Sequence, residues 1–369
     1  MFPKIKRNFG FGCMRLPQHE DKTVDREKFC EMVDLFLESG FNYFDTAHGY
    51  LGGDSESALR DCLTSRHPRE SFFLTDKLST YHFESQEEIA PLFESQLRAC
   101  GVEYFDLYLM HAQDRTLYEK YERCHAYETA YSFLAEGRIR HFGISFHDRA
   151  DVLERILTDH PEVEVVQIQL NYVDFDDPVV ESRKLLEVCR RFGKGVIVME
   201  PVKGGSLARL PAAAARELDR LGGGSHAGYA LRFAAGHEGV FMVLSGMGSL
   251  DMVRENVKLM QDFTPLDERE QAAISRVVGI LRAANTVPCT DCRYCIDGCP
   301  RGIEPPALFA CLNSKRSFDN WNSSYYYDIQ TAKGGRASDC IGCGACEAIC
   351  PQHLPIRQLL REVAAEFEK

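Results

Sequence analysis

The sequence has one tryptophan, no long apolar run and no excess of basic residues. None of its apolar stretches approaches the roughly 20 residues of a membrane-spanning helix, so we expect no membrane partner. Lysine and arginine total 43 against 55 acidic residues, and this net charge of -12 argues against a nucleic-acid partner. The basic segment Met1–Arg7 lacks the apolar core and cleavage site of a signal peptide after it, which predicts a cytoplasmic protein.

Cysteine is abundant, with fifteen residues in the chain. Seven of them stand alone along a large chain, a distribution that suits a reducing compartment. These isolated residues are Cys13, Cys30, Cys62, Cys100, Cys124, Cys189 and Cys311.

The other cysteines form two runs with the same pattern, CxxCxxCxxxCP. The runs are Cys289, Cys292, Cys295, Cys299 with Pro300, and Cys340, Cys343, Cys346, Cys350 with Pro351. In this pattern three thiolates bind one [4Fe-4S] cluster and the fourth binds the other cluster. Structural zinc is the alternative, but its CxxC pairs usually stand a dozen or more residues apart. We therefore predict two [4Fe-4S] clusters as cofactors.

Before these runs, short apolar segments alternate with stretches of helical periodicity, as in a parallel sheet with crossover helices. The candidate strands are Phe9–Met14, Phe41–Thr46, Phe72–Lys77, Asp106–His111, Ile139–Ser145, Val165–Leu170, Gly195–Glu200 and Gly239–Ser245. Eight strand–helix units predict a closed (β/α)8 TIM barrel, with a doubly wound sheet as the competing fold. No GxGxxG follows the first candidate strand. We place the barrel at residues 1–285 and a small ferredoxin-like α+β domain at 286–369.

Polar residues at the ends of these strands predict where chemistry takes place, because active sites of TIM barrels form there. Asp45 and Tyr50 follow the second candidate strand, Lys77 ends the third and His111 ends the fourth. A tyrosine has a pKa of about 10, and a nearby ammonium lowers it by stabilising the phenolate. We expect Lys77 to do this for Tyr50, so that Tyr50 protonates an alkoxide as it forms.

With this order of residues the chain resembles the aldo-keto reductase family, in the branch that carries a C-terminal ferredoxin-like domain. The resemblance covers about residues 9–260 and includes the segments Gly52–Glu56, Met199–Pro201 and Arg254–Asn256. It implies a catalytic tetrad of Asp45, Tyr50, Lys77 and His111. It also implies hydride transfer between NAD(P) and a small carbonyl or alcohol substrate, with tyrosine as acid/base.

The same resemblance implies a set of residues that bind the nicotinamide nucleotide. The set is Ser145, Gln167, Met199, Gly204, Gly205, Gly246, Gly248, Ser249, Glu255 and Asn256. Phe146 stands where the family commonly has an asparagine, and Met199 where many members have a tyrosine against the nicotinamide. Met252 replaces a frequent arginine, which leaves the choice between NAD and NADP open.

Clusters pass single electrons and nicotinamides pass hydrides, so direct coupling of the two needs a flavin or another carrier. The clusters therefore serve a flavin bound in the barrel, a ferredoxin or other redox partner, or only the structure of the domain. Two further alternatives are an electron-transfer module with the barrel as a docking scaffold, and an isomerase or lyase that uses the tetrad for proton transfer alone. The substrate and the oligomeric state are not predicted.

Overall fold

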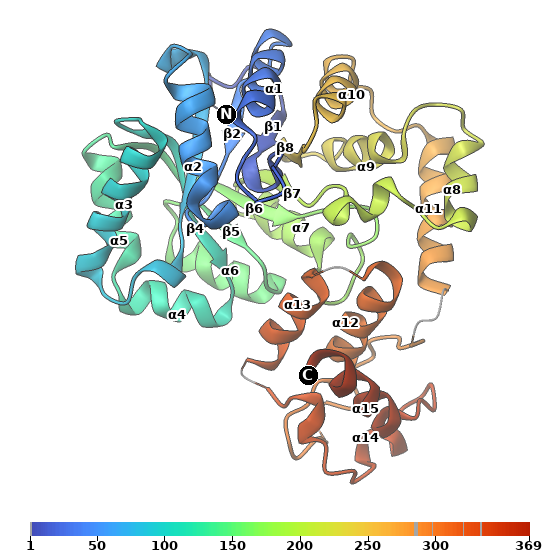
Figure 1. Cartoon of the computed structure of the whole chain (residues 1–369). Coiled ribbons are helices and arrows are strands. Elements are labelled where there is room, and N and C mark those ends of the chain that lie inside the picture. Colours follow the sequence, from blue (N-terminus) through green and yellow to red (C-terminus); the bar gives the residue numbers. More distant parts are fainter. Residues whose placement is uncertain (1, 284–286, 297, 320, 333) are drawn as a thin grey trace. The chain divides into compact units, whose positions relative to one another are not determined.

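The computed structural model of the chain describes residues 2–283, 287–296, 298–319, 321–332 and 334–369. Its central element is a closed sheet of eight strands in the order β1 to β8 (Figure 1). The strands are β1 (Phe9–Gly12), β2 (Tyr43–Asp45), β3 (Phe73–Leu78), β4 (Phe105–Gln113), β5 (Ile139–Phe146), β6 (Val165–Gln169), β7 (Gly195–Met199) and β8 (Val240–Gly246). All neighbouring pairs are parallel, and β1 closes on β8 with Gly12 opposite Gly246. The predicted TIM barrel is confirmed and the doubly wound sheet is excluded.

Helices between the strands and after β8 cover the outside of the barrel (Figure 1). They are α1 (Arg26–Glu38), α2 (Asp54–Leu59), α3 (Gln86–Cys100), α4 (Arg115–Arg123), α5 (Ala126–Ala135), α6 (Ala150–Asp159), α7 (Ser182–Arg191), α9 (His226–Ala235) and α10 (Leu250–Gln261). Helix α1 shows why such segments fold as they do. The Asp25 side chain caps its N-terminus by accepting from the Lys28 N–H, and apolar residues at helical spacing, Phe29 to Phe36, are buried.

The inside of the barrel is built in layers, because alternate residues of a strand point to the same face. One layer is an apolar cluster of Phe2, Tyr43, Phe73, Leu107, Leu109, Val165, Ile197, Met242 and Leu244. Two residues further along several of these strands the side chains become polar: Tyr43 is followed by Asp45, Leu109 by His111 and Val165 by Gln167. The fold thereby places a polar layer at the carboxyl ends of the strands, above an apolar floor.

The chain divides into two compact units, and the second comprises Tyr172–Glu181, Gly204–His226 and Asp267–Lys369. Its helices are α8 (Ala212–Asp219), α11 (Glu268–Ala283), α12 (Pro305–Phe318), α13 (Asn322–Thr331), α14 (Ala345–Ala348) and α15 (Ile356–Phe367). The domain boundary predicted at residues 285 and 286 lies outside the described residues.

The cysteine-rich region of the second unit is more helical than the α+β layout expected for it. Its described residues contain one isolated parallel bridge, between Ile303 and Gly335, and no strand. The described residues of the two cysteine runs lie mostly in irregular loops, with Cys346 on the short helix α14, and the aromatic segment between the runs forms α13 with Tyr326 and Tyr327 buried in the core of the unit. Because most of the backbone of the cysteine runs is irregular, helices α12, α13 and α15 supply most of the apolar core of this region.

Two of the seven isolated cysteines, whose scattered distribution suits a reducing compartment, are paired in the structure. Cys30 on α1 and Cys62 on the short helix Arg60–Thr64 form a disulfide, with their Cα atoms 4.6 Å apart. The packing of these two helices brings together residues separated by 32 positions, which spacing alone does not reveal. Cys13, Cys100, Cys124, Cys189 and Cys311 are free and buried.

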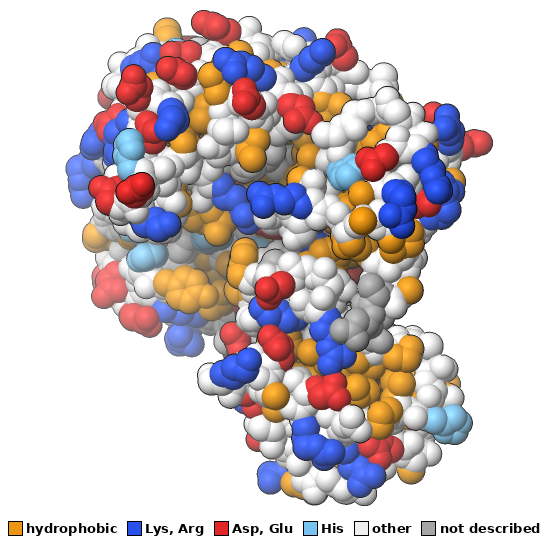
Figure 2. Space-filling model, turned by 45° about the vertical axis from the view of Figure 1, so that its right-hand side comes forward, with side chains coloured by type: hydrophobic (Ala, Val, Ile, Leu, Met, Phe, Trp, Pro, Cys, Tyr) orange, Lys and Arg blue, Asp and Glu red, His pale blue; other side chains and the backbone are white. Residues whose placement is uncertain are grey.

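Acidic and basic side chains are interspersed on the face shown in Figure 2, so this face carries no large patch of one charge. Within the described residues, no helix is long and apolar enough to cross a membrane.

Strands β5 and β6 pack closely at Gly143, so a substitution there tests the packing of the barrel. A Cβ atom there would lie 2.6 Å from both the carbonyl oxygen and Cγ2 of Val165 on the neighbouring strand β6. Because backbone cannot move aside, we expect Gly143→Ala to lower the free energy of unfolding by about 1–3 kcal/mol. Urea unfolding followed by circular dichroism measures this.

The matched control is Gly12→Ala on β1, where the nearest atoms to an added Cβ lie at 3.4 Å. We expect its unfolding free energy to change by less than about 0.5 kcal/mol. Equal effects of the two substitutions would contradict this account of the packing.

Candidate functional site

A buried ion pair forms the centre of the polar layer. The Lys77 ammonium donates to Asp45 Oδ1 at 2.6 Å and to the carbonyl oxygen of Thr46 at 2.6 Å. The pair forms because Asp45 ends β2 and Lys77 lies near the end of the neighbouring strand β3. Burial alone would lower the pKa of Lys77, but the Asp45 carboxylate raises it overall, so this lysine stays charged.

The other two predicted tetrad residues lie around this ammonium. Lys77 Nζ is 5.0 Å from the centroid of the Tyr50 ring, and the rings of Tyr50 and His111 meet edge to face with centroids 5.8 Å apart. Tyr50 begins a short turn, Tyr50–Gly53, that follows β2 and contains left-handed residues. The structure therefore brings together all four residues of the predicted tetrad.

The pKa of Tyr50 differs in direction from the sequence prediction. Burial raises it above its ordinary value, and the opposing effect of Lys77 is smaller. The prediction considered the ammonium but not the depth of the site. A raised pKa keeps the phenol protonated at neutral pH, which is the form that donates a proton.

His111 is held in one orientation by a residue that the sequence analysis missed. Ser79 Oγ lies 2.6 Å from His111 Nδ1, which leaves Nε2 as the other polar atom of the ring. Burial, helped by the charge of Lys77, lowers the pKa of His111 well below its usual value, so the imidazole is neutral. Ser79 stands two residues after Lys77, so period-two alternation on β3 was the signal that could have identified it.

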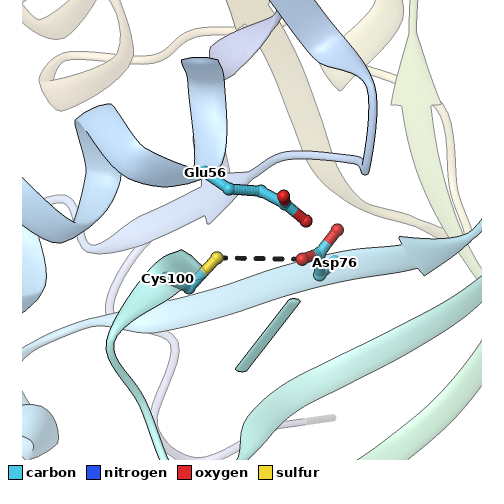
Figure 3. Close-up of side chains that lie close together, drawn as sticks. All are labelled: Glu56, Asp76 and Cys100. Atoms are coloured by element: carbon cyan, nitrogen blue, oxygen red, sulfur yellow. Dashed lines mark hydrogen bonds between the residues drawn. The ribbon is translucent and has the colours of Figure 1, made fainter. Parts of the chain in front are cut away.

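A second group of polar residues lies on the outer face of β3. The carboxyl groups of Glu56 and Asp76 point toward one another, beside the thiol of Cys100 (Figure 3). Burial raises the pKa of Asp76 well above its ordinary value, and the neighbouring Glu56 carboxyl adds to the increase. The buried site therefore favours the protonated form of Asp76. Glu56 also binds His48 Nδ1 at 3.0 Å, which ties α2 to the loop that carries Tyr50.

Three residues predicted to bind a nicotinamide line neighbouring strands of the barrel. Ser145 on β5 is opposite Gln167 on β6, and both are buried. Gln167 Oε1 has no hydrogen-bond partner among the described residues, although the side chain is only 3% exposed. Met199 ends β7, opposite Gln169. A buried amide oxygen without a partner fits a ligand that brings an N–H donor.

The predicted phosphate turn follows β8 and precedes α10. Gly246 ends β8, Gly248 lies in this turn, and Ser249 caps α10 by accepting from the Met252 N–H at 3.3 Å. Arg15, which the sequence analysis missed, lies against it: a Cβ on Gly246 would be 3.2 Å from Arg15 Cδ. A basic side chain, Arg15, therefore lies beside the turn. The arginine that is frequent in the family at position 252 is replaced by methionine in this chain.

Two residues predicted near the adenine behave differently from each other. Glu255 on α10 is exposed, whereas Asn256 is buried and donates to Ser245 Oγ at 3.2 Å. Asn256 thus fastens α10 to the end of β8.

Two further residues predicted to bind the nucleotide, Gly204 and Gly205, adopt positive φ angles of 66° and 96° in the turn after β7 and belong to the second compact unit.

The cysteine runs surround two cavities. The first cavity is lined by Cys289, Cys292, Cys295 and Cys350, and the second is lined by Cys299, Cys340, Cys343 and Cys346. Each cavity thus receives three cysteines from one run and the last cysteine from the other. Four thiols around one cavity form a donor set that fits a cubane cluster.

Comparison with known proteins agrees with this division of the chain. Residues 8–278 match the model of the aldo/keto reductase family, and residues 288–355 match that of a 4Fe-4S dicluster domain. The human protein aldo-keto reductase family 1 member C3 is 28% identical over 199 residues, which cover 49% of this chain and 58% of that relative. The match thus spans little more than half the length of that relative.

Solved structures extend the likeness to the whole barrel. The holo form of the aldo-keto reductase AKR11C1 from Bacillus halodurans is 26% identical with a TM-score of 0.60, over 73% of this chain and 91% of that one. An aldo-keto reductase from Klebsiella pneumoniae in complex with NADPH is 21% identical with a TM-score of 0.58, over 73% and 90% of the two chains. At that identity the second likeness concerns the fold alone.

The neighbouring carboxyl groups of Glu56 and Asp76 predict an unusual dependence of the unfolding free energy on pH. The pKa of Asp76 is higher in the folded chain than its value of 3.8 when unperturbed, so its stabilisation is complete below that value and is lost as pH rises. We expect Asp76→Asn to flatten the fall of unfolding free energy between pH 4 and 8, by at most about 1.4 kcal/mol per pH unit. Urea titrations at several pH values measure the slope.

Asp54→Asn is the matched control. Its partner Arg26 lowers the pKa of Asp54 to about 2, so its stabilisation is lost only as pH falls. Between pH 5 and 8 this variant should keep the wild-type slope. An Asp76→Asn slope equal to that of the wild type would show that Asp76 is not protonated in the folded chain.

Proposed function

Because the chain belongs to the aldo/keto reductase family, we propose that its barrel interconverts a small carbonyl compound and its alcohol, with Tyr50 as the general acid/base. The convergence of Tyr50, Lys77, His111 and Asp45 at the carboxyl ends of the strands is the observation that supports this proposal most. A carbonyl oxygen that becomes an alkoxide requires a proton donor and neutral or positive groups beside it.

The barrel residues fit a nicotinamide nucleotide. The buried Gln167 Oε1 without a partner suits the N–H of a carboxamide, and Ser145 lies opposite on the neighbouring strand. Arg15 beside Gly246 supports an anionic group at the turn before α10, whose N-terminal N–H groups favour phosphate. When bound, a reduced nicotinamide supplies the hydride for the carbonyl carbon.

Each member of the tetrad has a distinct task in this proposal. Tyr50, protonated because burial raises its pKa, donates its phenolic proton to the substrate oxygen. Lys77 then stabilises the phenolate that remains, and Asp45 keeps Lys77 charged and in place. Neutral His111, fixed through Nδ1 by Ser79, orients the carbonyl oxygen through Nε2.

Tyr50→Phe tests the proposal directly, since it removes the phenolic proton and leaves the ring. We expect the rate of NAD(P)H-dependent reduction of small aldehydes and ketones to fall by about 10²–10⁴. Nucleotide binding, followed by fluorescence titration, should remain.

Tyr104→Phe is the matched control, because Tyr104 precedes β4 at the other end of the strand and stacks on Arg69. It should react like the wild type. Full activity of Tyr50→Phe would remove Tyr50 from the proposed mechanism, and substrate conversion without consumption of a reductant would favour an isomerase or lyase.

We further propose that the two cysteine cavities hold [4Fe-4S] clusters, which exchange single electrons with a ferredoxin-type partner. The crossed donor sets support this, since each cavity receives a cysteine from the other run. Apolar side chains gather on part of the visible face of this region (Figure 2), and Tyr294, Ile341 and Ile349 are exposed beside the cysteine runs. Such a surface suits a transient redox partner.

The crossed arrangement predicts which cysteines act together. Cys299→Ala should alter the same electron paramagnetic resonance signal as Cys343→Ala, although the two belong to different runs. Cys350→Ala should pair in the same way with Cys292→Ala. Spectra of reduced, anaerobically purified protein, with iron analysis, measure this.

Cys311→Ala serves as control, since Cys311 is buried in the same region but lines neither cavity. It should keep about eight irons per chain. Grouping of the spectral changes by run instead of by cavity would refute the crossed arrangement, and bound zinc in place of iron would refute the clusters.

A flavin in the barrel is the second candidate carrier, and it would couple a hydride to single electrons. Met199 ends β7 at the place where many family members stack an aromatic ring on the nicotinamide, so this chain lacks that stacking partner. The optical spectrum of material released from denatured, anaerobically purified protein separates the candidates: a flavin spectrum supports barrel-to-cluster coupling, and its absence leaves the nicotinamide as hydride carrier.

A further inference from the structure

The two cysteine runs and the segments after them correspond position by position. Each Cys–Pro pair is followed five residues after the proline by the first residue of a helix, Pro305 of α12 and Ile356 of α15. When Cys299 is aligned with Cys350, residue 301 corresponds to 352, and residue 306 corresponds to 357. The first and second cavities can therefore be compared residue for residue.

This comparison reveals a difference in charge. Arg301 and Arg357 line the second cavity, whereas the corresponding residues of the first cavity are Gln352 and Pro306. Among the described residues that line the first cavity, none is charged apart from the cysteines. The apolar positions match better: Leu360 of the second cavity corresponds to Phe309 of the first, and Ile303 to Leu354.

Arg357 is fixed against the loop that carries the cysteines of the second cavity. Its Nη1 donates to the carbonyl oxygen of Gly342 at 3.4 Å, and its Nη2 pairs with Glu347 Oε2 at 2.7 Å. Arg357 lines the cavity and Glu347 does not. Arg301 is exposed, and it forms no ion pair with any residue that the structure describes.

We propose that the second cavity holds the cluster with the higher reduction potential, so that the first electron to enter the domain rests there. This inference depends on the proposed function in one respect, the presence of a [4Fe-4S] cluster in each cavity. Reduction adds one electron to a group that is already anionic, with no bond broken and no proton taken up. Nearby positive charge stabilises the more negative, reduced form and raises the potential.

The test is a redox titration of the full, anaerobically purified chain, followed by electron paramagnetic resonance with chemical mediators. Arg301→Gln should lower the midpoint potential of the signal that appears at the higher potential and leave the other signal unchanged. Gln352→Arg introduces the charge at the corresponding position of the first cavity and should raise the lower potential. Both residues are exposed, so the fold does not depend on them.

Arg361→Gln is the matched control, since Arg361 is exposed on the same helix as Arg357 and lines neither cavity. It should leave both potentials as in the wild type. The inference is overturned if Arg301→Gln shifts the lower-potential signal, or shifts both signals no more than the control. A wild-type chain with only about four irons would refute the pair of clusters itself, an outcome that iron analysis distinguishes from a wrong order of potentials.

Discussion

The buried ion pair between Lys77 and Asp45 is the interaction on which the site in the barrel depends. A buried charge that loses its partner costs about 3–5 kcal/mol, so neither residue is tolerated without the other. The 2.6 Å contact requires β2 and β3 to be neighbours in their observed register. The position of Tyr50 follows from it, because its ring lies 5.0 Å from the same ammonium. Barrel geometry and proposed chemistry thus rest on one pair of charges.

The two faces of β3 handle charge in opposite ways. Lys77 faces the inside of the barrel as a cation, whereas its neighbour Asp76 faces outward, where burial raises its pKa and favours the protonated form. The backbone N–H of Lys77 donates to Asp76 Oδ1 at 2.8 Å. Glu56 binds His48 in the loop before Tyr50. The outer face of the strand therefore helps to hold the loop that carries the proposed acid.

Much of this arrangement follows from sequence, because buried parallel strands read as apolar runs and their last polar residues mark the active face. All eight predicted strands are confirmed, and the four predicted tetrad residues converge. Contacts between distant outer faces were missed: Glu56 with Asp76, and Cys30 with Cys62. The direction of the Tyr50 pKa was wrong, because it depends on depth of burial, which a sequence does not state.

In the proposed function, the barrel and the cysteine-rich region handle electrons in different numbers. A hydride carries two electrons, and Tyr50, as the proposed acid, would supply the proton that accompanies it in a reduction. A pair of cysteine cavities offers two places for single electrons, which equals the number in one hydride. In the proposed order of potentials, Arg301 and Arg357 line one cavity and neutral residues line the other, so two electrons would enter at different potentials. Unequal cavities would thus give the electrons an order, which two identical cavities would not.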